Sequence, residues 1–552
     1  MRSFTSTVGG PRSPARSAVT ISLRHPARRA TIGDQLRRHA QHQPDKPALV
    51  FYHPAGRREV LTYAALNERA NRLANRLAAL GIGHGDRIAM MSRNSPDYVI
   101  AWYAALKLGA PFTGVNFTFT ETEISYQINH CRAKVLIVED AFVAKITNAT
   151  TPLPSIEQFV VSDVSGGADA PAGWHRFSTL IADGSPDEPA ADVGEDDVAM
   201  LVYTSGTEAF PKGVMIPHRN YLISTTPAWM AALDVRPDDV WLFLMPFHTI
   251  AGLGSMTTLT LLGATLILAH SVDAATALDW IADDGVTLMA QTPTFYLAMT
   301  QVDGFATMDV GKLRRCLTYG GLVPKAMIDA WRAAAPSIVW GTYWGQSELS
   351  QLGSIGWFAT LDDVPGGDPS WIGKPVPQLE IRVVDADGNE AETGELLCRS
   401  PSCMLGYLDD DERTSDVLRG GWLHTGDLVR IDADGNLFFF DRAKDMIKTG
   451  GMNVSSVEVE RVLYQHASIM EVAVVGVPDD KWSEAVTAFA VARPGQDIDA
   501  AAVIAHCKEH LAPFKVPKAV HIVEALPKDT QGKILKRELR KLTSETLTAT
   551  ET

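Results

Sequence analysis

An apolar stretch that runs directly into a glycine- and hydroxyl-rich turn constrains the fold of this chain more than any other feature. The stretch covers Val198 to Val202, and the turn covers the twelve residues from Tyr203 to Val214, with four hydroxyl side chains, two glycines and one lysine. Glycines let a backbone bend tightly and present bare N–H groups, hydroxyls donate hydrogen bonds, and a lysine adds a point charge. The junction therefore predicts a strand followed by a loop that suits a polyphosphate. An ordinary Gly/Ser turn is the alternative interpretation.

Strand-like and helix-like segments alternate on both sides of this turn. Apolar residues recur at helical spacing from Leu66 to Leu80, and the glycines at 81 and 83 would end that helix. Strands are expected at 86–91, 134–138, 264–269 and 286–290, and a further helix at 98–108. This alternation indicates an α/β architecture with mostly parallel sheets. Residues 162–196, rich in Asp, Gly, Ala and Pro, are expected to form a surface connection.

The chain is expected to divide near residue 440. Its 552 residues exceed the size at which one hydrophobic core keeps growing. After the apolar residues 436–440, strands are expected at 471–475 and 486–491 and helices at 457–466 and 500–510. We therefore predict a large N-terminal domain of stacked, mostly parallel sheets with helices over residues 34–440, a hinge at 441–445, and a small α+β C-terminal domain over residues 446–552.

The first 33 residues differ from the rest of the chain. They contain six arginines and no acidic residue, because the first carboxylate is that of Asp34. A basic, acid-poor leader is typical of an organelle transit peptide or of a disordered tail, and its Gly-Gly-Pro and Ser-Pro steps favour the tail.

Composition narrows the range of partners. Hydrophobic residues make up 46% of the chain, but no apolar run reaches the roughly 18 residues that span a bilayer, so a transmembrane segment is not expected. The net charge of −15 argues against nucleic acid as a partner. The five cysteines are scattered without metal-ligand spacing, which favours reduced structural thiols in a cytoplasmic protein.

The glycine- and hydroxyl-rich turn resembles the phosphate loop of the adenylate-forming enzymes, the acyl-CoA synthetases and their relatives. Its glycines and lysine do not have the spacing of the other common phosphate-binding loop, that of the P-loop proteins. Further segments match the same family in the expected order, at 344–348, 421–427, 441–460 and 526–534. The resemblance spans about residues 60 to 540, nearly the whole chain outside the leader.

The resemblance implies a site for ATP, Mg²⁺ and the acyl group. The implied nucleotide-binding residues are Thr204, Ser205, Gly206, Thr207 and Lys212 at the phosphates, Gly320 and Gly321 beside adenine and the acyl group, Ser347 at the α-phosphate, Asp427 at the ribose, and Arg442 at ribose or phosphate. Trp344 would offer an exposed indole face to adenine, and Glu348 would hold Mg²⁺, which prefers oxygen ligands.

The resemblance also implies the groups that act in catalysis. Lys533 matches the catalytic lysine of adenylation, and Lys444 matches the hinge about which the C-terminal domain rotates. Gly450 and Gly451 match the loop along which the pantetheine arm of coenzyme A passes. His248 would border the acyl site and shift between two half-reactions, although a histidine on an apolar stretch is also compatible with a satisfied core residue.

The implied activity is that of an acyl-CoA ligase, which joins a carboxylic acid to AMP and then to the thiol of coenzyme A. Gly345 stands where acetate-specific relatives have a tryptophan that closes the acyl pocket, so a medium, long or bulky hydrophobic acid is expected, aryl acids included. Two residues depart from the family pattern: Glu208 places a carboxylate in the phosphate loop, and Asn453 stands where some relatives have arginine.

Three other functions remain open at this point. The acyl group could pass to a carrier protein instead of coenzyme A, the chain could be a luciferase-like oxygenase of the same fold, or it could bind ATP or acyl groups without catalysis. Glu208 motivates the last of these, whereas Lys533 and Glu348 weigh against it. The sequence also leaves a homodimer open.

Overall fold

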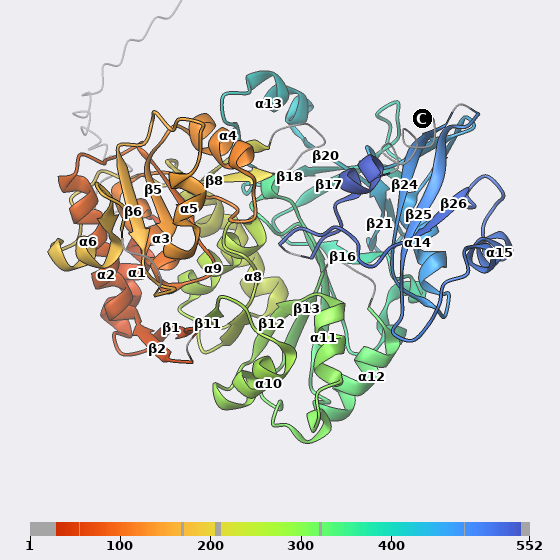
Figure 1. The fold of residues 1–552 in the computed structure, drawn as a ribbon, viewed down its shortest axis with the longest axis horizontal. Coiled ribbons are helices and arrows are strands. Elements are labelled where there is room, and N and C mark those ends of the chain that lie inside the picture. The colour runs from red at the N-terminus through yellow and green to blue at the C-terminus, as the bar shows by residue number, and fades with distance from the viewer. Residues whose placement is uncertain are drawn as a thin grey trace, which may run out of the picture.

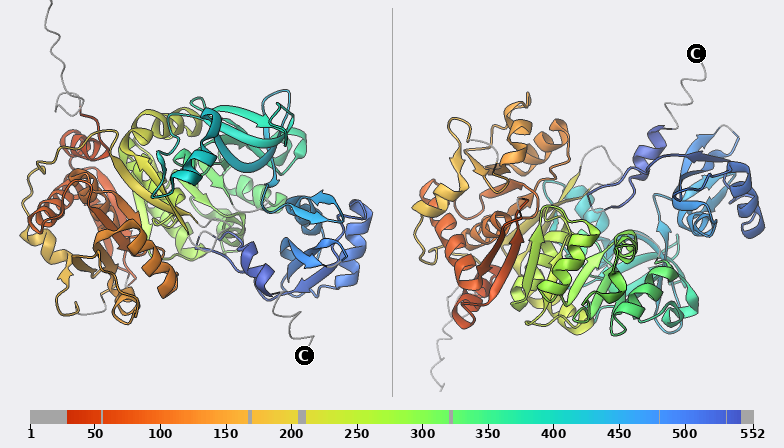
Figure 2. Two further views of the ribbon diagram at one scale, coloured as in Figure 1. Left: turned by 90° about the horizontal axis from the view of Figure 1, so that it is seen from above. Right: turned by 60° about the horizontal axis from the view of Figure 1, so that its bottom comes forward.

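Two large sheets and one small sheet organise the molecule, as Figures 1 and 2 show. The computed structural model describes residues 29–54, 56–166, 170–204, 211–319, 323–479, 481–530 and 532–542. In both views of Figure 2 the blue C-terminal part lies at one end of the molecule, away from the red N-terminal helices.

The first sheet combines a parallel half with an antiparallel half. In spatial order its strands are β17 (Glu380–Val384), β18 (Thr393–Arg399), β20 (Leu423–Ile431), β21 (Leu437–Arg442), β16 (Trp371–Pro375), β15 (Ser354–Phe358), β14 (Val339–Trp344), β13 (Arg315–Thr318), β12 (Leu288–Gln291), β10 (Val240–Phe243), β11 (Thr265–Ala269), β1 (Pro47–Tyr52) and β2 (Arg58–Thr62). The strands from β14 to β1 run parallel, and those from β14 to β17 are antiparallel.

The second sheet carries the strand that leads into the candidate phosphate loop. Its strands in spatial order are β19 (Gly406–Tyr407), β9 (Lys212–Pro217), β8 (Val198–Thr204), β4 (Phe112–Gly114), β3 (Arg87–Met91), β5 (Ala133–Glu139), β6 (Gln158–Ser162) and β7 (His175–Arg176). From β8 to β7 the strands are parallel. The predicted α/β architecture is confirmed, but the expectation of mostly parallel strands holds for the second sheet and for only half of the first.

Helices separate the two sheets and cover their outer faces, which gives five layers (Figure 1). Four helices lie between the sheets: α1 (Ile32–His42), α2 (Tyr63–Ala79), α3 (Pro96–Leu108) and α9 (Ile250–Leu262). The outer face of the first sheet is covered by α10 (Ala274–Asp283), α11 (Pro293–Thr300) and α12 (Lys325–Ala334). The outer face of the second sheet is covered by α4 (Glu121–Cys131) and α5 (Val143–Thr147). The remaining N-terminal helices are α6 (Phe177–Asp183), α7 (His218–Asn220), the π-helical η2 (Tyr221–Thr225), α8 (Thr226–Leu233) and α13 (Asp411–Val417).

Helix α3 illustrates how local sequence and burial agree. The Ser95 hydroxyl caps its N-terminus, Pro96 occupies the first turn, and Gly109 ends it in the left-handed conformation with φ of 70°. Because α3 is apolar on every side, it can only be stable between two hydrophobic layers, and every residue of it is buried except Asp97.

Residues 162–196 differ from the expected surface connection. They contain β7 and α6, and the α6 side chains Phe177 and Leu180 are buried in the main core. The low apolar content of the surrounding residues concealed this short amphipathic helix.

The C-terminal part has its own sheet and its own core. Its strands are β23 (Met452–Val454), β22 (Ile447–Thr449), β25 (Ser483–Ala492) and β24 (Ile469–Asp479), with β26 (Ala519–Ile522) beside β25, and its helices are α14 (Ser456–Tyr464) and α15 (Ala500–His510). Its buried apolar clusters begin at Ile447, whereas those of the N-terminal part end at Phe438.

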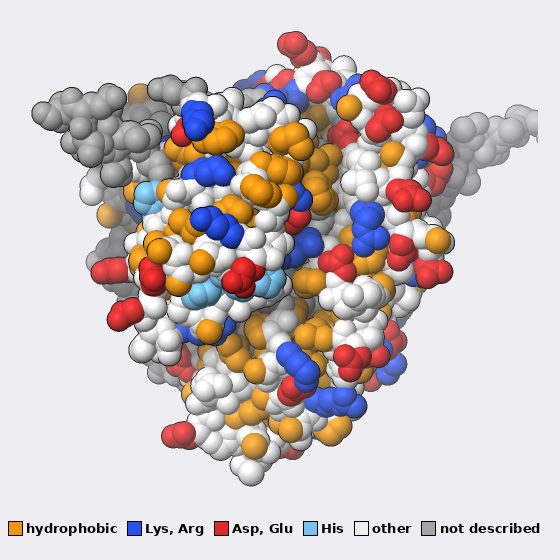
Figure 3. All heavy atoms as spheres, turned by 90° about the vertical axis from the view of Figure 1, so that its right-hand side faces the viewer, with side chains coloured by type: hydrophobic (Ala, Val, Ile, Leu, Met, Phe, Trp, Pro, Cys, Tyr) orange, Lys and Arg blue, Asp and Glu red, His pale blue; other side chains and the backbone are white. Residues whose placement is uncertain are grey.

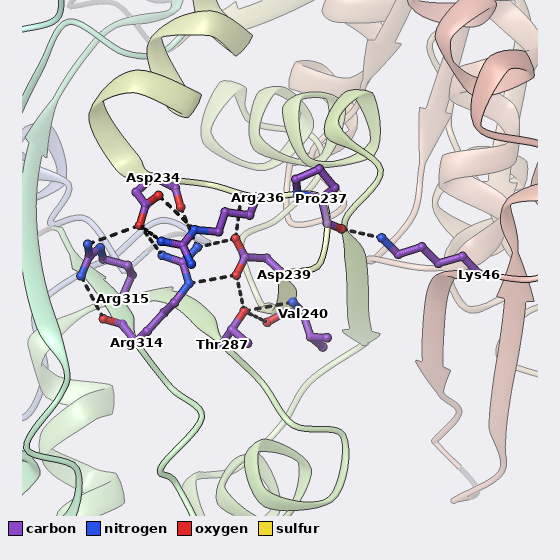
Figure 4. Close-up of polar contacts among 9 residues, drawn as sticks. All are labelled: Lys46, Asp234, Arg236, Pro237, Asp239, Val240, Thr287, Arg314 and Arg315. Atoms are coloured by element: carbon purple, nitrogen blue, oxygen red, sulfur yellow. Dashed lines mark hydrogen bonds and ion pairs between the residues drawn. The ribbon is translucent and has the colours of Figure 1, made fainter. Parts of the chain in front are cut away.

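A polar network closes the amino ends of the parallel strands of the first sheet (Figure 4). The buried Asp239 carboxylate, just before β10, accepts hydrogen bonds from the Thr287 hydroxyl at 2.7 Å and from the Arg314 guanidinium at 2.5 and 3.1 Å. Arg314 also pairs with Asp234 at 3.1 Å. The opposite, carboxyl ends of the strands are therefore the ends left for a ligand, as in other open α/β sheets.

Figure 3 shows the face turned toward the right of Figure 1. Lys and Arg side chains there are interspersed with Asp, Glu and apolar side chains, and the described part of this face has no continuous basic stripe of the kind that nucleic-acid-binding proteins carry. No helix in the described ranges is both long and apolar enough to span a bilayer.

Candidate active site

Asp427 on β20 is the centre of the candidate site. Its carboxylate is buried and accepts hydrogen bonds from the Trp344 indole N–H and the Gln346 amide, both at 2.8 Å. The Arg442 Nε lies 3.1 Å from its other oxygen. These contacts draw β14, β20 and β21 together and hold a charged acceptor in a fixed orientation.

Lys533, from the C-terminal part, lies close to this carboxylate. The positive charge of Arg442 is the main cause that lowers the pKa of Lys533 to about 8, and the carboxylates of Asp427 and Asp529 oppose it. Lys444 lies within electrostatic reach of the same group. The structure therefore brings Asp427, Arg442, Lys444 and Lys533 together from segments on both sides of the predicted hinge.

A second group of side chains surrounds Glu348. The Tyr407 hydroxyl donates to Glu348 Oε1 at 2.9 Å and accepts a hydrogen bond from Lys212 Nζ at 2.6 Å, and Lys212 Nζ lies 3.5 Å from the same carboxylate oxygen. The Lys212 ammonium also lies 4.1 Å from the centre of the Tyr407 ring. Tyr407 on β19 thereby orients both groups that the sequence assigns to phosphate and metal.

His248 lies between the two parts of the chain. Burial lowers the pKa of His248 to about 3, so its imidazole is neutral. Its Nε2 lies 2.9 Å from the Thr530 hydroxyl, and its Nδ1 is buried without a hydrogen-bond partner. The edge of its ring meets Phe117 at a centroid distance of 5.5 Å.

Several predicted nucleotide-binding residues lie outside the described residues. They are Ser205, Gly206, Thr207, Gly320 and Gly321, and Glu208 is among the same segments. The adjacent Thr204, at the end of β8, is described, and its hydroxyl is buried without a hydrogen-bond partner. A buried, unpaired hydroxyl at the mouth of this loop is the kind of group that a ligand satisfies.

Trp344 does not offer the exposed face that the sequence predicts. Only 8% of its surface is accessible, because its indole donates to Asp427 and one side of its six-membered ring packs against the backbone of Gly353. A side chain at position 353 would begin 2.3 Å from that ring. Ser347, three residues further along the chain, is buried in a short 3-10 turn.

Gly345 does not open the acyl pocket, contrary to the expectation from the sequence. A Cβ atom at Gly345 would lie 1.5 Å from the carbonyl oxygen of Gln351, so the chain itself occupies the space of a side chain there. The loop reaches this position because Ser350 and Gln351 both adopt positive φ, 51° and 101°. Gly345 is thus required by local packing.

Gly450 and Gly451 form the turn of a hairpin between β22 and β23. Their φ values are 57° and 79°, the left-handed conformation that two-residue hairpin turns need. The turn is exposed, and a Cβ at Gly451 would meet nothing within 4 Å. The structure does not bring these glycines to Asp427; it brings Lys533 there instead.

The predicted hinge contacts both parts of the chain, because residues 441 and 442 also end β21 of the first sheet. The buried Asp441 carboxylate accepts from the Ser456 backbone N–H at 2.7 Å and from its hydroxyl at 2.9 Å, and Asp445 pairs with Arg540 at 3.0 Å. Lys444 between them is exposed and makes none of the hydrogen bonds that fix its neighbours.

Three site residues escaped the sequence reasoning. Gln346 lies between two assigned residues, Thr530 lies three residues before Lys533, and Tyr407 lies outside every segment from which the resemblance implies site residues. For Gln346 and Thr530, a polar side chain near assigned site residues was the available signal; for Tyr407 there was no such signal.

The arrangement concentrates positive charge where a polyphosphate would lie. Lys212, Arg442, Lys444 and Lys533 gather around Asp427 and Glu348, and the carboxylates of Asp445 and Asp529 also lie within electrostatic reach of Lys444 and Lys533, respectively. Such a site can neutralise a triphosphate and stabilise charge that develops during attack on phosphorus.

Comparison with known proteins agrees with this geometry. Residues 36–408 match the family model of the AMP-binding enzymes, and residues 458–533 match the model of the AMP-binding enzyme C-terminal domain. The long-chain-fatty-acid–CoA ligase FadD13 of Mycobacterium tuberculosis is 32% identical over 88% of this chain and 94% of its own length. The fatty acid–[acyl-carrier-protein] ligase ScoC of Streptomyces coeruleorubidus is 31% identical over 91% and 94%.

A solved structure extends the similarity to three dimensions. The crystal structure of the anthranilate CoA ligase AuaEII in complex with anthranoyl-AMP superposes with a TM-score of 0.81 at 30% identity, covering 93% of this chain and 97% of that one. With ordered motifs, shared architecture and two matching family models, the chain belongs to the AMP-binding enzyme family, in its acyl-CoA synthetase branch.

Proposed function

We propose that this protein is an AMP-forming acyl-CoA ligase that activates a hydrophobic carboxylic acid, with ATP, Mg²⁺ and coenzyme A as co-substrates and cofactor. The observation that supports the proposal is the approach of the C-terminal loop to the N-terminal part: the Thr530 hydroxyl lies 2.9 Å from His248 Nε2, and Lys533 is within electrostatic reach of Asp427 and Arg442. The acid and the triphosphate are both anions, so such cations are needed before they can meet.

In the first half-reaction the substrate carboxylate attacks the α-phosphorus of ATP, and pyrophosphate leaves. We assign Lys533, Arg442 and Lys212 to neutralising the phosphates, and Asp427 to accepting hydrogen bonds from the ribose. The Thr204 hydroxyl, for which the described residues supply no hydrogen-bond partner, is available to the phosphates. Ser205, Gly206 and Thr207 are proposed to complete the phosphate loop, and Ser347 to contact the α-phosphate.

The residues around Glu348 fit a magnesium ion bound partly by substrate. Among the described residues no group of three or more His, Cys, Asp or Glu side chains could hold a metal by itself. Mg²⁺ is commonly bound by one or two carboxylates together with phosphate oxygens, and Glu348 is a carboxylate fixed by its contacts with Lys212 and Tyr407. When bound, the ion would supply charge neutralisation at the phosphates.

In the second half-reaction the thiol of coenzyme A displaces AMP from the acyl-adenylate. We propose that the C-terminal domain, residues 446–552, rotates about Lys444 within the hinge 441–445, which withdraws Lys533 and presents Gly450 and Gly451 to the N-terminal domain, residues 34–440. The exposed Lys444 between two anchored carboxylates supports this choice of pivot.

A small, mostly apolar cavity, with room for about one water molecule, marks where we propose that a hydrophobic acyl group enters. Trp229 and Leu233 of α8, Met245 after β10, Leu317 at the end of β13 and Leu352 line it, together with the polar side chains of Ser255 and Gln351. Tyr343 also lines it and immediately precedes Trp344 in the chain. Gly320 and Gly321, which we place beside adenine and the acyl group, follow the end of β13 close to the lining residue Leu317.

The test is ATP–pyrophosphate exchange with purified protein across short-chain, long-chain and aryl carboxylic acids, followed by addition of coenzyme A to each acid that responds. We expect exchange with hydrophobic acids, little with acetate, and a CoA thioester in the second step. Exchange without a thioester would favour a carrier protein as acceptor, as in the ligase ScoC. No exchange with any acid would favour a non-catalytic relative.

Tyr407 gives a prediction about the metal. Replacing Tyr407 with phenylalanine leaves Glu348 paired only with Lys212, so we expect the Mg²⁺ concentration for half-maximal exchange to rise about 10-fold, the effect typical of losing a group that orients a metal ligand. Tyr52→Phe removes a hydroxyl that pairs with Asp284 at 2.6 Å near the far edge of the first sheet, and serves as the control. An unchanged Mg²⁺ dependence in Tyr407→Phe would contradict this role.

We also propose a cytoplasmic location and a homodimeric assembly. All five cysteines are free thiols, which suits the cytoplasm, where ATP and coenzyme A are available. A homodimer is also proposed for testing, and sedimentation velocity at micromolar concentration distinguishes it from a monomer.

A further inference from the structure

The loop that carries Lys533 also touches the histidine beside the acyl site. The Thr530 hydroxyl and His248 Nε2 are 2.9 Å apart, although the residues are separated by 282 positions in the chain. This is a direct side-chain contact between the C-terminal part and the segment that follows β10. The proposed mechanism assigns Thr530 no task.

Thr530 is the one side chain among the described residues that hydrogen-bonds to this imidazole. Phe117 makes a T-shaped contact with the ring at a centroid distance of 5.5 Å, and burial lowers the pKa of His248 to about 3. The Nδ1 atom is buried without a partner. A neutral ring with one polar partner depends on that partner for its orientation.

The same contact selects the tautomer of His248. A neutral imidazole has one N–H donor and one acceptor nitrogen. If the threonine hydroxyl accepted from Nε2–H, the buried Nδ1 would keep a bare lone pair; if the hydroxyl donated, Nδ1 would carry a buried, unpaired N–H. Unpaired buried donors are the rarer and costlier case, so the contact favours the Nε2–H tautomer.

Thr530 and Lys533 lie in one short turn whose described residues are joined by hydrogen bonds. The Asp529 side chain accepts from the Lys533 backbone N–H at 2.9 Å, the Asp529 backbone N–H donates to the Lys533 carbonyl at 2.9 Å, and Gly532 N–H closes the turn onto the Asp529 carbonyl at 3.0 Å. The two side chains therefore enter and leave the site together.

We propose that Thr530 is a positioning residue for adenylate formation: it holds the neutral His248 imidazole in one tautomer and one orientation while Lys533 is in the site, and it releases the ring when the C-terminal domain moves away. The inference rests on the proposed acyl-CoA ligase function. Through this one hydrogen bond, the orientation of the His248 ring beside the acyl site would depend on the position of the C-terminal domain.

The test compares Thr530→Val with Thr530→Ser. Valine keeps the shape of the side chain and removes the hydroxyl, whereas serine keeps the hydroxyl. For Thr530→Val we expect kcat/KM for the acid in pyrophosphate exchange to fall about 10-fold, mostly through a higher KM, as for the loss of one hydrogen bond. Thioester formation from a synthetic acyl-adenylate should be unchanged, and Thr530→Ser should restore exchange.

A second comparison, made in a protein that lacks the His248 side chain, tests whether Thr530 acts through His248. In a His248→Ala protein, Thr530→Val should have no further effect on exchange, because the group that Thr530 positions is gone. Equal losses in both half-reactions, additive effects with His248→Ala, or wild-type rates in Thr530→Val would each overturn the inference. If the wild-type protein itself exchanges with no acid, the proposed function fails instead, so the two failures are distinguishable.

Discussion

Replacing Lys533 with alanine should slow acyl-adenylate formation about 100-fold or more while sparing thioester formation from a pre-made acyl-adenylate. The ammonium group lies with Arg442 beside Asp427, and removing one preorganised group that stabilises transition-state charge typically costs 10² to 10³ in rate. Pyrophosphate exchange measures the first half-reaction, and release of AMP from the synthetic adenylate measures the second. Lys541→Ala, which removes an exposed lysine of the same domain, is the control.

The pH dependence offers an independent check on the same residue. Because Arg442 lowers the pKa of Lys533 to about 8, the free protein loses this positive charge as the pH rises through 8. The value of kcat/KM for ATP should therefore fall above pH 8, and Lys533→Arg should move that fall to higher pH because arginine stays charged. A profile that is flat between pH 7 and 9.5, or equal losses of both half-reactions in Lys533→Ala, would refute the assigned role.

Replacing Asp239 with alanine should lower the free energy of unfolding of the N-terminal domain by about 3 to 5 kcal/mol, as expected when one partner of a buried ion pair is removed. The Asp239 carboxylate accepts hydrogen bonds from Thr287, from the Arg236 backbone N–H at 2.7 Å and from Arg314, whose guanidinium is mostly buried (Figure 4). Without Asp239, the ion-pair partner that remains for Arg314 among the described residues is Asp234, whose carboxylate is partly exposed to solvent.

Urea unfolding followed by tryptophan fluorescence measures this loss. Asp238→Ala, at the exposed neighbouring carboxylate, is the matched control and should change the free energy of unfolding by less than about 0.5 kcal/mol. Similar midpoints for Asp239→Ala and Asp238→Ala would show that the network contributes little. Since the network lies at the amino ends of the strands, the KM values of any folded Asp239 variant should stay close to those of the wild type.

The periodic elements of the fold were predictable from the sequence. The helix at Leu66 to Leu80, the strand before the phosphate loop and the strands at 471–475 and 486–491 are all confirmed as α2, β8, β24 and β25. Each has an apolar pattern whose period matches its own structure. The antiparallel half of the first sheet was not foreseen, because strand direction depends on connections that leave no local pattern.

The site was predictable in its charges but less so in its packing. Motif order identified Asp427, Arg442 and Lys533, which the structure brings together. The burial of Trp344 and the Gln351 carbonyl beside Gly345 depend on how a loop with two positive φ angles folds back, which no residue type there signals. The contact between Thr530 and His248 joins two domains and needs three-dimensional coordinates to be seen.

The position of β1 within the first sheet has a consequence for synthesis on the ribosome. Strand β1 ends at Tyr52, but the neighbour that it pairs with in parallel, β11, begins only at Thr265. At 5 to 20 residues per second, β1 waits roughly 10 to 40 s for that partner. During this time its apolar face and one hydrogen-bonding edge are uncovered, so nascent chains that stop before β11 should be clients of chaperones and sensitive to proteases.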